Sequence, residues 1–166
     1  MSLFYIVDGY NLIKRAPLFK HKRLQEARSG FLTFVELSRP HGSQRNRLAI
    51  VFDGSAQVFG YRENYSFEVI FTAGETADEK IKEMVASFDR PKDIVVVTDD
   101  RELLFSVRAL QAKTMGTVEF LNKARREDKT PKKSNGFSDA QDGSNLNIVE
   151  REKITEEVSR IWLKKK

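Results

Sequence analysis

The sequence has no cysteine and only two histidines, His21 and His41. Without cysteine, the chain cannot form a disulfide scaffold, a cysteine-ligated zinc site, an iron–sulfur cluster or a thiol nucleophile. The two histidines lie far apart and lack a metal-binding spacing such as HxxxH. A metal site in this protein therefore has to be built from oxygen ligands.

Long hydrophobic runs are also missing. The continuous apolar runs, such as residues 48–52 and 94–97, are about five residues long or shorter, whereas a membrane-spanning helix needs about 20. The beginning of the sequence has neither the basic region nor the cleavage motif of a signal peptide. We therefore expect a cytoplasmic protein with no membrane partner.

Several sequence motifs of enzymes are absent. No GxxxxGK[ST] or GxGxxG occurs, which excludes a P-loop and a dinucleotide fingerprint, and no GxSxG occurs, which excludes a hydrolase elbow. A phosphatase with an Asp-x-Asp nucleophile would need an acid at position 10, where this chain has Tyr10. A receiver domain would need an acid pair on the first strand, which offers only Asp8.

The composition is that of a folded domain with a mildly basic surface. The 166 residues include 29 Lys and Arg against 24 Asp and Glu, which gives a net charge of +5, and 40% of residues are hydrophobic. This length fits one domain, or one domain and a tail. The positive balance permits a nucleic acid or another polyanion as partner without requiring one.

Strand-like runs alternate with amphipathic helical segments along the chain. Apolar runs at residues 3–7, 48–52 and 94–97, an alternating pattern at residues 67–71 and a short segment at residues 112–115 predict five strands. Helical spacing follows Lys22, Thr76, Asp100 and Thr117. Such alternation predicts an α/β fold with a central, mostly parallel five-stranded sheet flanked by helices. We expect the first and fourth strands to be central.

The predicted folded domain comprises residues 1–127. Residues 128–150 are rich in Lys, Ser, Asn, Gly and Asp and are predicted to form a flexible polar loop. In residues 151–166, Ile154, Val158 and Trp162 return to helical spacing. This pattern predicts a C-terminal helix that docks on the same domain.

Four acidic residues follow predicted strands. Asp8, Asp53 and Asp100 come at or just after strand ends, and Asp78 begins the helix that follows the third strand. The carboxyl ends of parallel strands share one edge of a sheet, where binding sites form. Carboxylates gathered there repel one another unless a cation neutralises them. Because Mg²⁺ and Mn²⁺ take oxygen ligands, we expect an all-carboxylate site for one of these ions.

Each acid also has a local explanation. Asp8 and Asp53 both precede glycine, as in common turns. Asp78 lies in a predicted capping box that Thr76 opens, and Asp99 has the position of an N-cap. These local roles do not explain why all of these acids follow the ends of predicted strands.

Taken together, the motifs resemble those of the YacP-like NYN proteins, a branch of the PIN-like nucleases. Residues 7–13 read VDGYNLI and are similar to the VDGYN opening of this family. Residues 51–53 (VFD), 68–72 (EVIFT), 75–79 (ETADE) and 97–100 (VTDD) resemble its later motifs. The resemblance extends over about residues 3–127 and implies a three-layer PIN-like domain.

The resemblance implies a Mg²⁺- or Mn²⁺-dependent endoribonuclease, which in some members acts on mRNA at the ribosome. Asp8, Asp78 and Asp100 match the acidic positions of the PIN-like site and would be the catalytic metal ligands. Asn11, Asp53, Thr98 and Asp99 would support them. Asp99 stands where the family usually has a small hydroxyl residue, so the sequence leaves open whether Asp99 or Asp100 coordinates.

Basic residues are the candidates for RNA binding, although a solvated surface would explain them equally well. The candidates are Lys14, Arg15, Lys22, Arg23, Arg125 and Arg126. Two other functions remain open: a non-catalytic RNA- or ribosome-binding module on the same fold, and a structure-specific nuclease that acts on DNA. The intact acid set favours an enzyme over the binding module.

Overall fold

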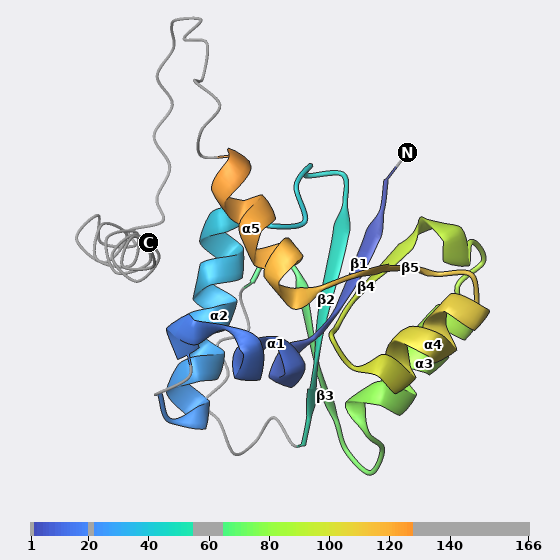
Figure 1. The fold of residues 1–166 in the computed structure, drawn as a ribbon, viewed down its shortest axis with the longest axis horizontal. Helices are drawn as coiled ribbons and strands as arrows, with labels where there is room; N and C mark the ends of the chain where they lie inside the picture. The colour runs from blue at the N-terminus through green and yellow to red at the C-terminus, as the bar shows by residue number, and fades with distance from the viewer. Residues whose placement is uncertain (1, 20–21, 55–64, 128–166) are drawn as a thin grey trace, which may run out of the picture. The chain divides into compact units, whose positions relative to one another are not determined.

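A five-stranded parallel sheet forms the centre of the domain that the structure describes (Figure 1). The computed structural model describes residues 2–19, 22–54 and 65–127. Within these ranges the strand order is β3-β2-β1-β4-β5, and every neighbouring pair is parallel. The strands are β1 (Phe4–Asp8), β2 (Arg47–Asp53), β3 (Glu68–Thr72), β4 (Ile94–Val97) and β5 (Lys113–Met115). The predicted α/β class and the central places of the first and fourth strands are confirmed.

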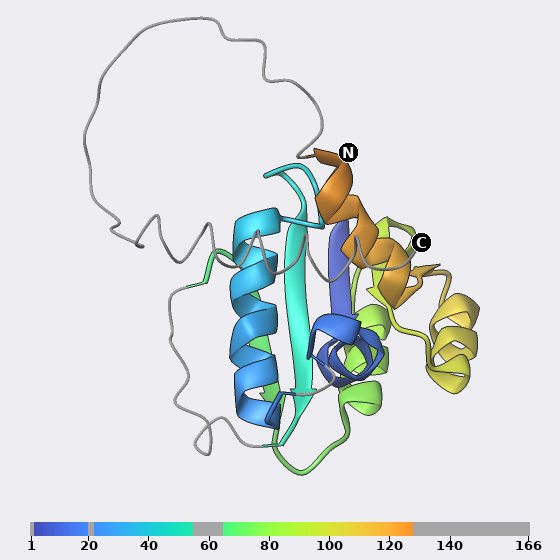
Figure 2. The same cartoon turned by 60° about the vertical axis from the view of Figure 1, so that its left-hand side comes forward.

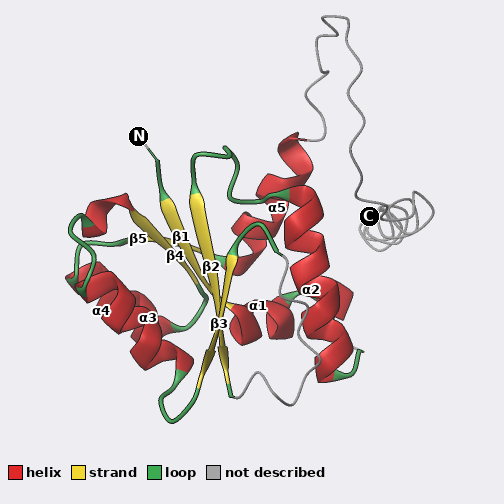
Figure 3. Cartoon of the chain, turned by 180° about the vertical axis from the view of Figure 1, so that it is seen from behind, coloured by secondary structure: helices red, strands yellow, loops and turns green. Residues whose placement is uncertain are grey.

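Helices cover both faces of the sheet, which gives three layers (Figures 2 and 3). Helices α1, α2 and α5 pack on one face, and α3 and α4 pack on the other. The helices are α1 (Gly9–Arg15), α2 (Leu24–Ser38), α3 (Ala77–Ala86), α4 (Arg101–Ala109) and α5 (Thr117–Glu127), with short 3-10 turns η1 (Pro17–Phe19) and η3 (Pro91–Asp93).

The continuous apolar runs in the strands follow from this double coverage. Tyr5 and Val7 of β1 point into the core beneath α1, α2 and α5, where Phe31 of α2 is fully buried. Phe4 and Ile6 point into the second core, beneath α3 and α4. Because alternate side chains of a strand face opposite sides, a strand covered on both sides has to be apolar at every position.

The register of the strands brings the site residues together. Asp8 pairs with Val51 of β2, and Val7 pairs with Val97 of β4. Thr98, the residue that follows β4, therefore lies beside Asp8. The carboxyl ends of β1, β2 and β4 meet at one edge, which is the edge that the sequence predicted for the site.

Two local features differ from the prediction. Helix α1 was not expected: it follows β1 directly, with Asp8 as its N-cap. The N-cap of α4 is Asp100 and not Asp99, which corrects the sequence interpretation. The predicted capping box of α3 is confirmed, since Thr76 accepts from the backbone N–H of Glu79 and the Glu79 carboxylate accepts from that of Thr76.

Two predicted segments, residues 128–150 and 151–166, lie outside the described residues. Within the part of the chain that the structure describes, no helix is both long and apolar enough to cross a bilayer.

Candidate active site at the carboxyl edge of the sheet

Asp8 lies at the end of the central strand and is almost fully buried, with 7% of its surface exposed. One carboxylate oxygen, Oδ1, accepts from the backbone N–H of Asn11 at 3.0 Å. The other, Oδ2, accepts from the hydroxyl of Thr98 at 3.2 Å. The carboxylate is thus held by α1 on one side and by the end of β4 on the other.

The surroundings of Asp8 raise its pKa to about 6. Burial is the largest cause, and the negative charges of Asp78 and Asp53 raise it further, while the hydrogen bonds from Asn11 and Thr98 oppose the shift. A buried carboxylate under repulsion from its neighbours is stabilised by a cation. Asp8 is therefore the strongest candidate metal ligand among the described residues.

Asp78, in the first turn of α3, faces the same group of acids. Burial raises its pKa, and the charges of Asp100, Asp53 and Glu102 raise it further, whereas Lys82 lowers it. The site therefore combines acids from β1, β2, α3 and the start of α4. Helix dipole and capping alone do not account for Asp78, because both effects would lower the pKa of a carboxyl in the first turn.

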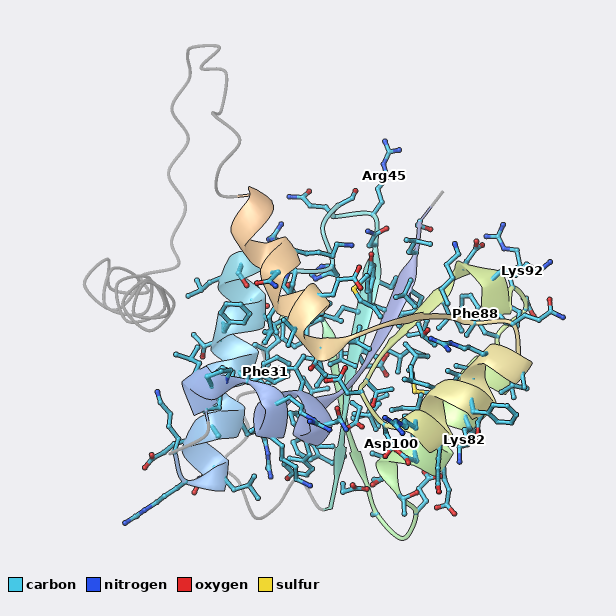
Figure 4. The ribbon with its side chains drawn as sticks, in the orientation of Figure 1. Phe31, Arg45, Lys82, Phe88, Lys92 and Asp100 are labelled. Atoms are coloured by element: carbon cyan, nitrogen blue, oxygen red, sulfur yellow. The ribbon has the colours of Figure 1, made fainter. Side chains whose placement is uncertain are left out.

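Thr98 connects Asp8 to Asp100. Its side chain is completely buried, and its hydroxyl donates to Asp8 and accepts from the backbone N–H of Asp100 at 3.1 Å. The Asp100 side chain caps α4, with its Oδ1 accepting from the backbone N–H groups of Glu102 at 2.9 Å and Leu103 at 3.0 Å. Figure 4 shows Asp100 at the start of α4, on the same side of the sheet as Lys82 of α3.

Asp53 and Asp99 have clear structural roles. Asp53 accepts from the backbone N–H of Ala77 through Oδ1, which ties the end of β2 to the start of α3. Asp99 turns toward α5, where its two oxygens accept from the backbone N–H and the hydroxyl of Thr117. Its own N–H donates to the side-chain oxygen of Asn11 at 3.0 Å. Asp99 thus joins α1 and α5 at this edge.

The chemistry of this donor set fits a hard divalent cation. Mg²⁺ is usually held by one or two carboxylates, with water and substrate phosphate completing its shell. Across the described residues, no group of three or more His, Asp or Glu side chains stands close enough to hold an ion by itself. Asp8 and Asp78, whose charges act on each other, are carboxylates of the kind that such an ion takes.

The basic candidates lie on the surface near the ends of helices. Lys14 and Arg15 end α1, and Lys22 and Arg23 precede α2, whose first turn lies toward the edge where the strands end (Figure 1). All four are exposed. Arg125 and Arg126 fall in α5, near its end.

A buried arginine was missed by sequence reasoning. Arg28 of α2 is only 3% exposed, donates to the hydroxyl of Tyr10 and lies over the rings of Tyr10, Phe52 and Phe71 at 5.2–5.3 Å. Its burial could have been inferred from its position, because Arg28 lies three residues before the core residue Phe31 and therefore on the same face of the helix. Through Tyr10, this arginine supports α1, which carries Asn11.

Comparison with known proteins gives independent evidence on the family and the fold of this chain. The model of the YacP-like NYN domain matches residues 5–164. The crystal structure of Rae1 (YacP) from Bacillus subtilis is 27% identical, with a TM-score of 0.62, and the match covers 98% of this chain and 88% of that one. A crystal structure of a tryptophan-to-leucine mutant of Rae1 is also 27% identical, with a TM-score of 0.61 and 78% of each chain covered. No curated protein matches.

Proposed function

The chain belongs to the YacP-like NYN domain family, and from this premise we propose that it is a divalent-metal-dependent endoribonuclease. The observation that carries the proposal is the buried Asp8 carboxyl, whose pKa is raised to about 6 by burial and by the charges of Asp78 and Asp53. A protein gains nothing in stability from gathering like charges at one edge. A site that binds a cation and a phosphate explains them.

Asp8, Asp78 and Asp100 are the residues that would hold Mg²⁺ or Mn²⁺. The ion would lower the pKa of a bound water and neutralise charge on the reacting phosphodiester. Thr98 orients Asp8 and the backbone of Asp100, and Asn11 fixes the end of β4 against α1. Asp99 acts as a tie to α5 and not as a ligand, because its carboxylate turns to Thr117 and is not among the charges that raise the pKa of Asp8 or Asp78.

RNA is the substrate that we propose, with mRNA on the ribosome as the form that the family resemblance implies. The exposed Lys14, Arg15, Lys22 and Arg23 would attract its phosphates, with Arg125 and Arg126 as further contributors. Such contacts position a strand but carry no sequence information. The cytoplasm, where mRNA is translated, is the compartment that this function requires.

The direct test is cleavage of end-labelled RNA and DNA oligonucleotides of the same sequence. The parent protein should cut RNA internally in the presence of Mn²⁺ or Mg²⁺ and should be inactive with a chelator. Asp8→Asn should reduce cleavage by at least about two orders of magnitude, while Asp89→Asn, which changes an exposed acid just after α3, should not. Equal cleavage of DNA would support the DNA nuclease instead.

A second candidate is an RNA-binding module that uses the same fold without catalysis. The observation that favours it is that, among the described residues, no three acids or histidines form a ready-made metal site. RNA binding without any metal-dependent cleavage, over a range of RNA substrates, would support this alternative.

A further inference from the structure

The outer face of α4 carries an unusual exposed aromatic residue. Phe105 is 78% exposed, which is the largest exposure of any large hydrophobic residue in the described part of the chain. It lies about 200° around the helix axis from the buried Leu103 and Val107. Phe105 therefore points directly away from the core and contributes nothing to packing beneath the helix.

Two arginines flank this ring. Arg101 precedes Phe105 by four residues and Arg108 follows it by three, so all three side chains share one helix face. Both arginines are exposed. The only acid in α4 is Glu102, which precedes Phe105 by three residues and flanks the ring on the side opposite the two arginines. Its charge acts on Asp78 of the candidate site. The face thus presents an aromatic ring between two positive charges.

The position of one arginine is fixed by the sheet. Arg108 donates from Nε and from a terminal nitrogen to the hydroxyl of Thr114 on β5, at 3.0 and 2.9 Å. Holding the guanidinium in place in advance reduces the entropy lost when it binds an anion.

The same helix begins at the candidate active site. Asp100 is the N-cap of α4, and Phe105 lies about 7.5 Å further along the helix axis. A strand whose phosphate reaches the acids at the carboxyl edge can therefore continue along this face. Single-stranded nucleic acid is the ligand that suits it, since bases stack on aromatic rings while arginines bind phosphates.

From these contacts we propose that Arg101, Phe105 and Arg108, here named the α4 face, form a subsite for single-stranded RNA beside the bond that is cut. Phe105 stacks on a base of the strand flanking that bond, and the two arginines bind phosphates on either side of it. This proposal rests on the proposed function, because it assigns part of the substrate to a surface outside the acid cluster.

The test measures RNA affinity without cleavage. The full chain is titrated against a fluorescently labelled oligouridylate in the presence of a chelator, and anisotropy gives the dissociation constant. Phe105→Ala should weaken binding about 5- to 150-fold, the range measured for loss of base stacking. Phe105→Trp should restore it. Leu37→Ala, which removes an exposed apolar side chain near the end of α2, should leave it unchanged.

Salt dependence and a ligand without bases separate the roles of the three residues. Arg101→Gln and Arg108→Gln should each reduce the salt slope by about 0.7, as expected for one phosphate contact on a single strand. Phe105→Ala should leave that slope unchanged. It should also leave the affinity for inorganic polyphosphate unchanged, because that ligand offers no base to stack.

The proposal is overturned if Phe105→Ala binds oligouridylate as tightly as the parent does, or if it weakens polyphosphate binding to the same extent. Failure of the parent to bind the oligonucleotide also overturns it. The proposed endoribonuclease activity is tested separately. A protein that binds RNA through Phe105 but never cleaves it would support the subsite and contradict the proposed activity.

Discussion

The hydroxyl of Thr98 donates a hydrogen bond to the carboxylate of Asp8 across 3.2 Å, between the ends of two neighbouring strands of the sheet. Both residues are buried. Because the same hydroxyl accepts from the backbone N–H of Asp100, this single side chain sets the relative positions of two candidate metal ligands. It also lowers the pKa of Asp8 against the effect of burial.

Removing this hydroxyl should make Asp8 harder to ionise. In Thr98→Val, the Asp8 carboxylate loses a donor that stabilises its charged form, so its pKa should rise above the parent value of about 6. A titration followed by carboxyl ¹³C NMR measures this shift. Thr98→Ser keeps the hydroxyl and should titrate as the parent does. An unchanged Asp8 pKa in Thr98→Val would show that the hydroxyl has no electrostatic role.

The charge of Asp8 should destabilise the fold at neutral pH. Its pKa is about 6 in the folded protein, against the ordinary 3.8 of an unfolded chain, so its favourable contribution is complete below about pH 4 and is lost as the pH rises through about 6. Without metal, Asp8→Asn should thus be more stable than the parent at about pH 8, by on the order of 2–3 kcal/mol. This advantage should shrink as the pH falls toward about 4.

Denaturant unfolding at about pH 4.5, 6 and 8 in a chelator checks this trend. The control is Asp89→Asn, which removes an exposed acid away from the cluster. Its difference from the parent should vary little with pH. A constant difference for Asp8→Asn over the same range would contradict the electrostatic account.

Two glycine substitutions should have opposite effects on stability. A Cβ on Gly9 would clash with the ring of Phe52, so Gly9→Ala forces the ring or α1 to move, at a cost of about 1–3 kcal/mol. At Gly30, inside α2, the nearest atom to a Cβ would be 3.5 Å away. Gly30→Ala should therefore stabilise the protein by about 0.5–1 kcal/mol, through helix propensity. Thermal unfolding should show a lower melting temperature than the parent for Gly9→Ala and a higher one for Gly30→Ala.

The sequence predicted those parts of the fold that depend on burial. Strands covered on both faces must be apolar throughout, so β1, β2 and β4 were visible as continuous runs and implied a parallel sheet. The family assignment is confirmed as well, since the model of the YacP-like NYN domain matches residues 5–164. Asp8 and the acids whose charges raise its pKa come from segments that end or begin at one edge.

The features that could not be predicted from the sequence are a very short helix and contacts between residues far apart in the chain. Helix α1 has only seven residues and starts at a glycine, too short for a clear periodicity. The sequence alone does not show which of the adjacent Asp99 and Asp100 faces the site. Their roles differ because Thr117, 18 residues beyond Asp99, donates a hydrogen bond to the Asp99 carboxylate. The burial of Arg28 likewise depends on rings from β2 and β3 that cover its guanidinium.

The different roles of Asp99 and Asp100 give a further prediction. Asp99→Asn keeps an oxygen that can accept from the N–H of Thr117, so it should cost no more than about 1 kcal/mol and should retain Mn²⁺-dependent stabilisation. Asp100→Asn also keeps a good helix cap, but it should lose most of that stabilisation. Thermal melts with and without Mn²⁺ compare the two variants. The reverse result would make Asp99 the ligand.

The most direct test of the carboxylate site compares Asp78→Asn with Glu79→Gln, since each removes one negative charge from the first turn of α3. Thermal melts of the parent and both variants are recorded in a chelator and with Mn²⁺ at about a hundredfold excess over its dissociation constant. The parent and Glu79→Gln should both gain about 2.7 kcal/mol from the ion. Asp78→Asn should be at least as stable as the parent without metal and should lose most of the gain. An Asp78→Asn protein that melts below the parent in chelator, yet gains the full increment from Mn²⁺, would contradict the account and leave Asp78 a helix-start residue only.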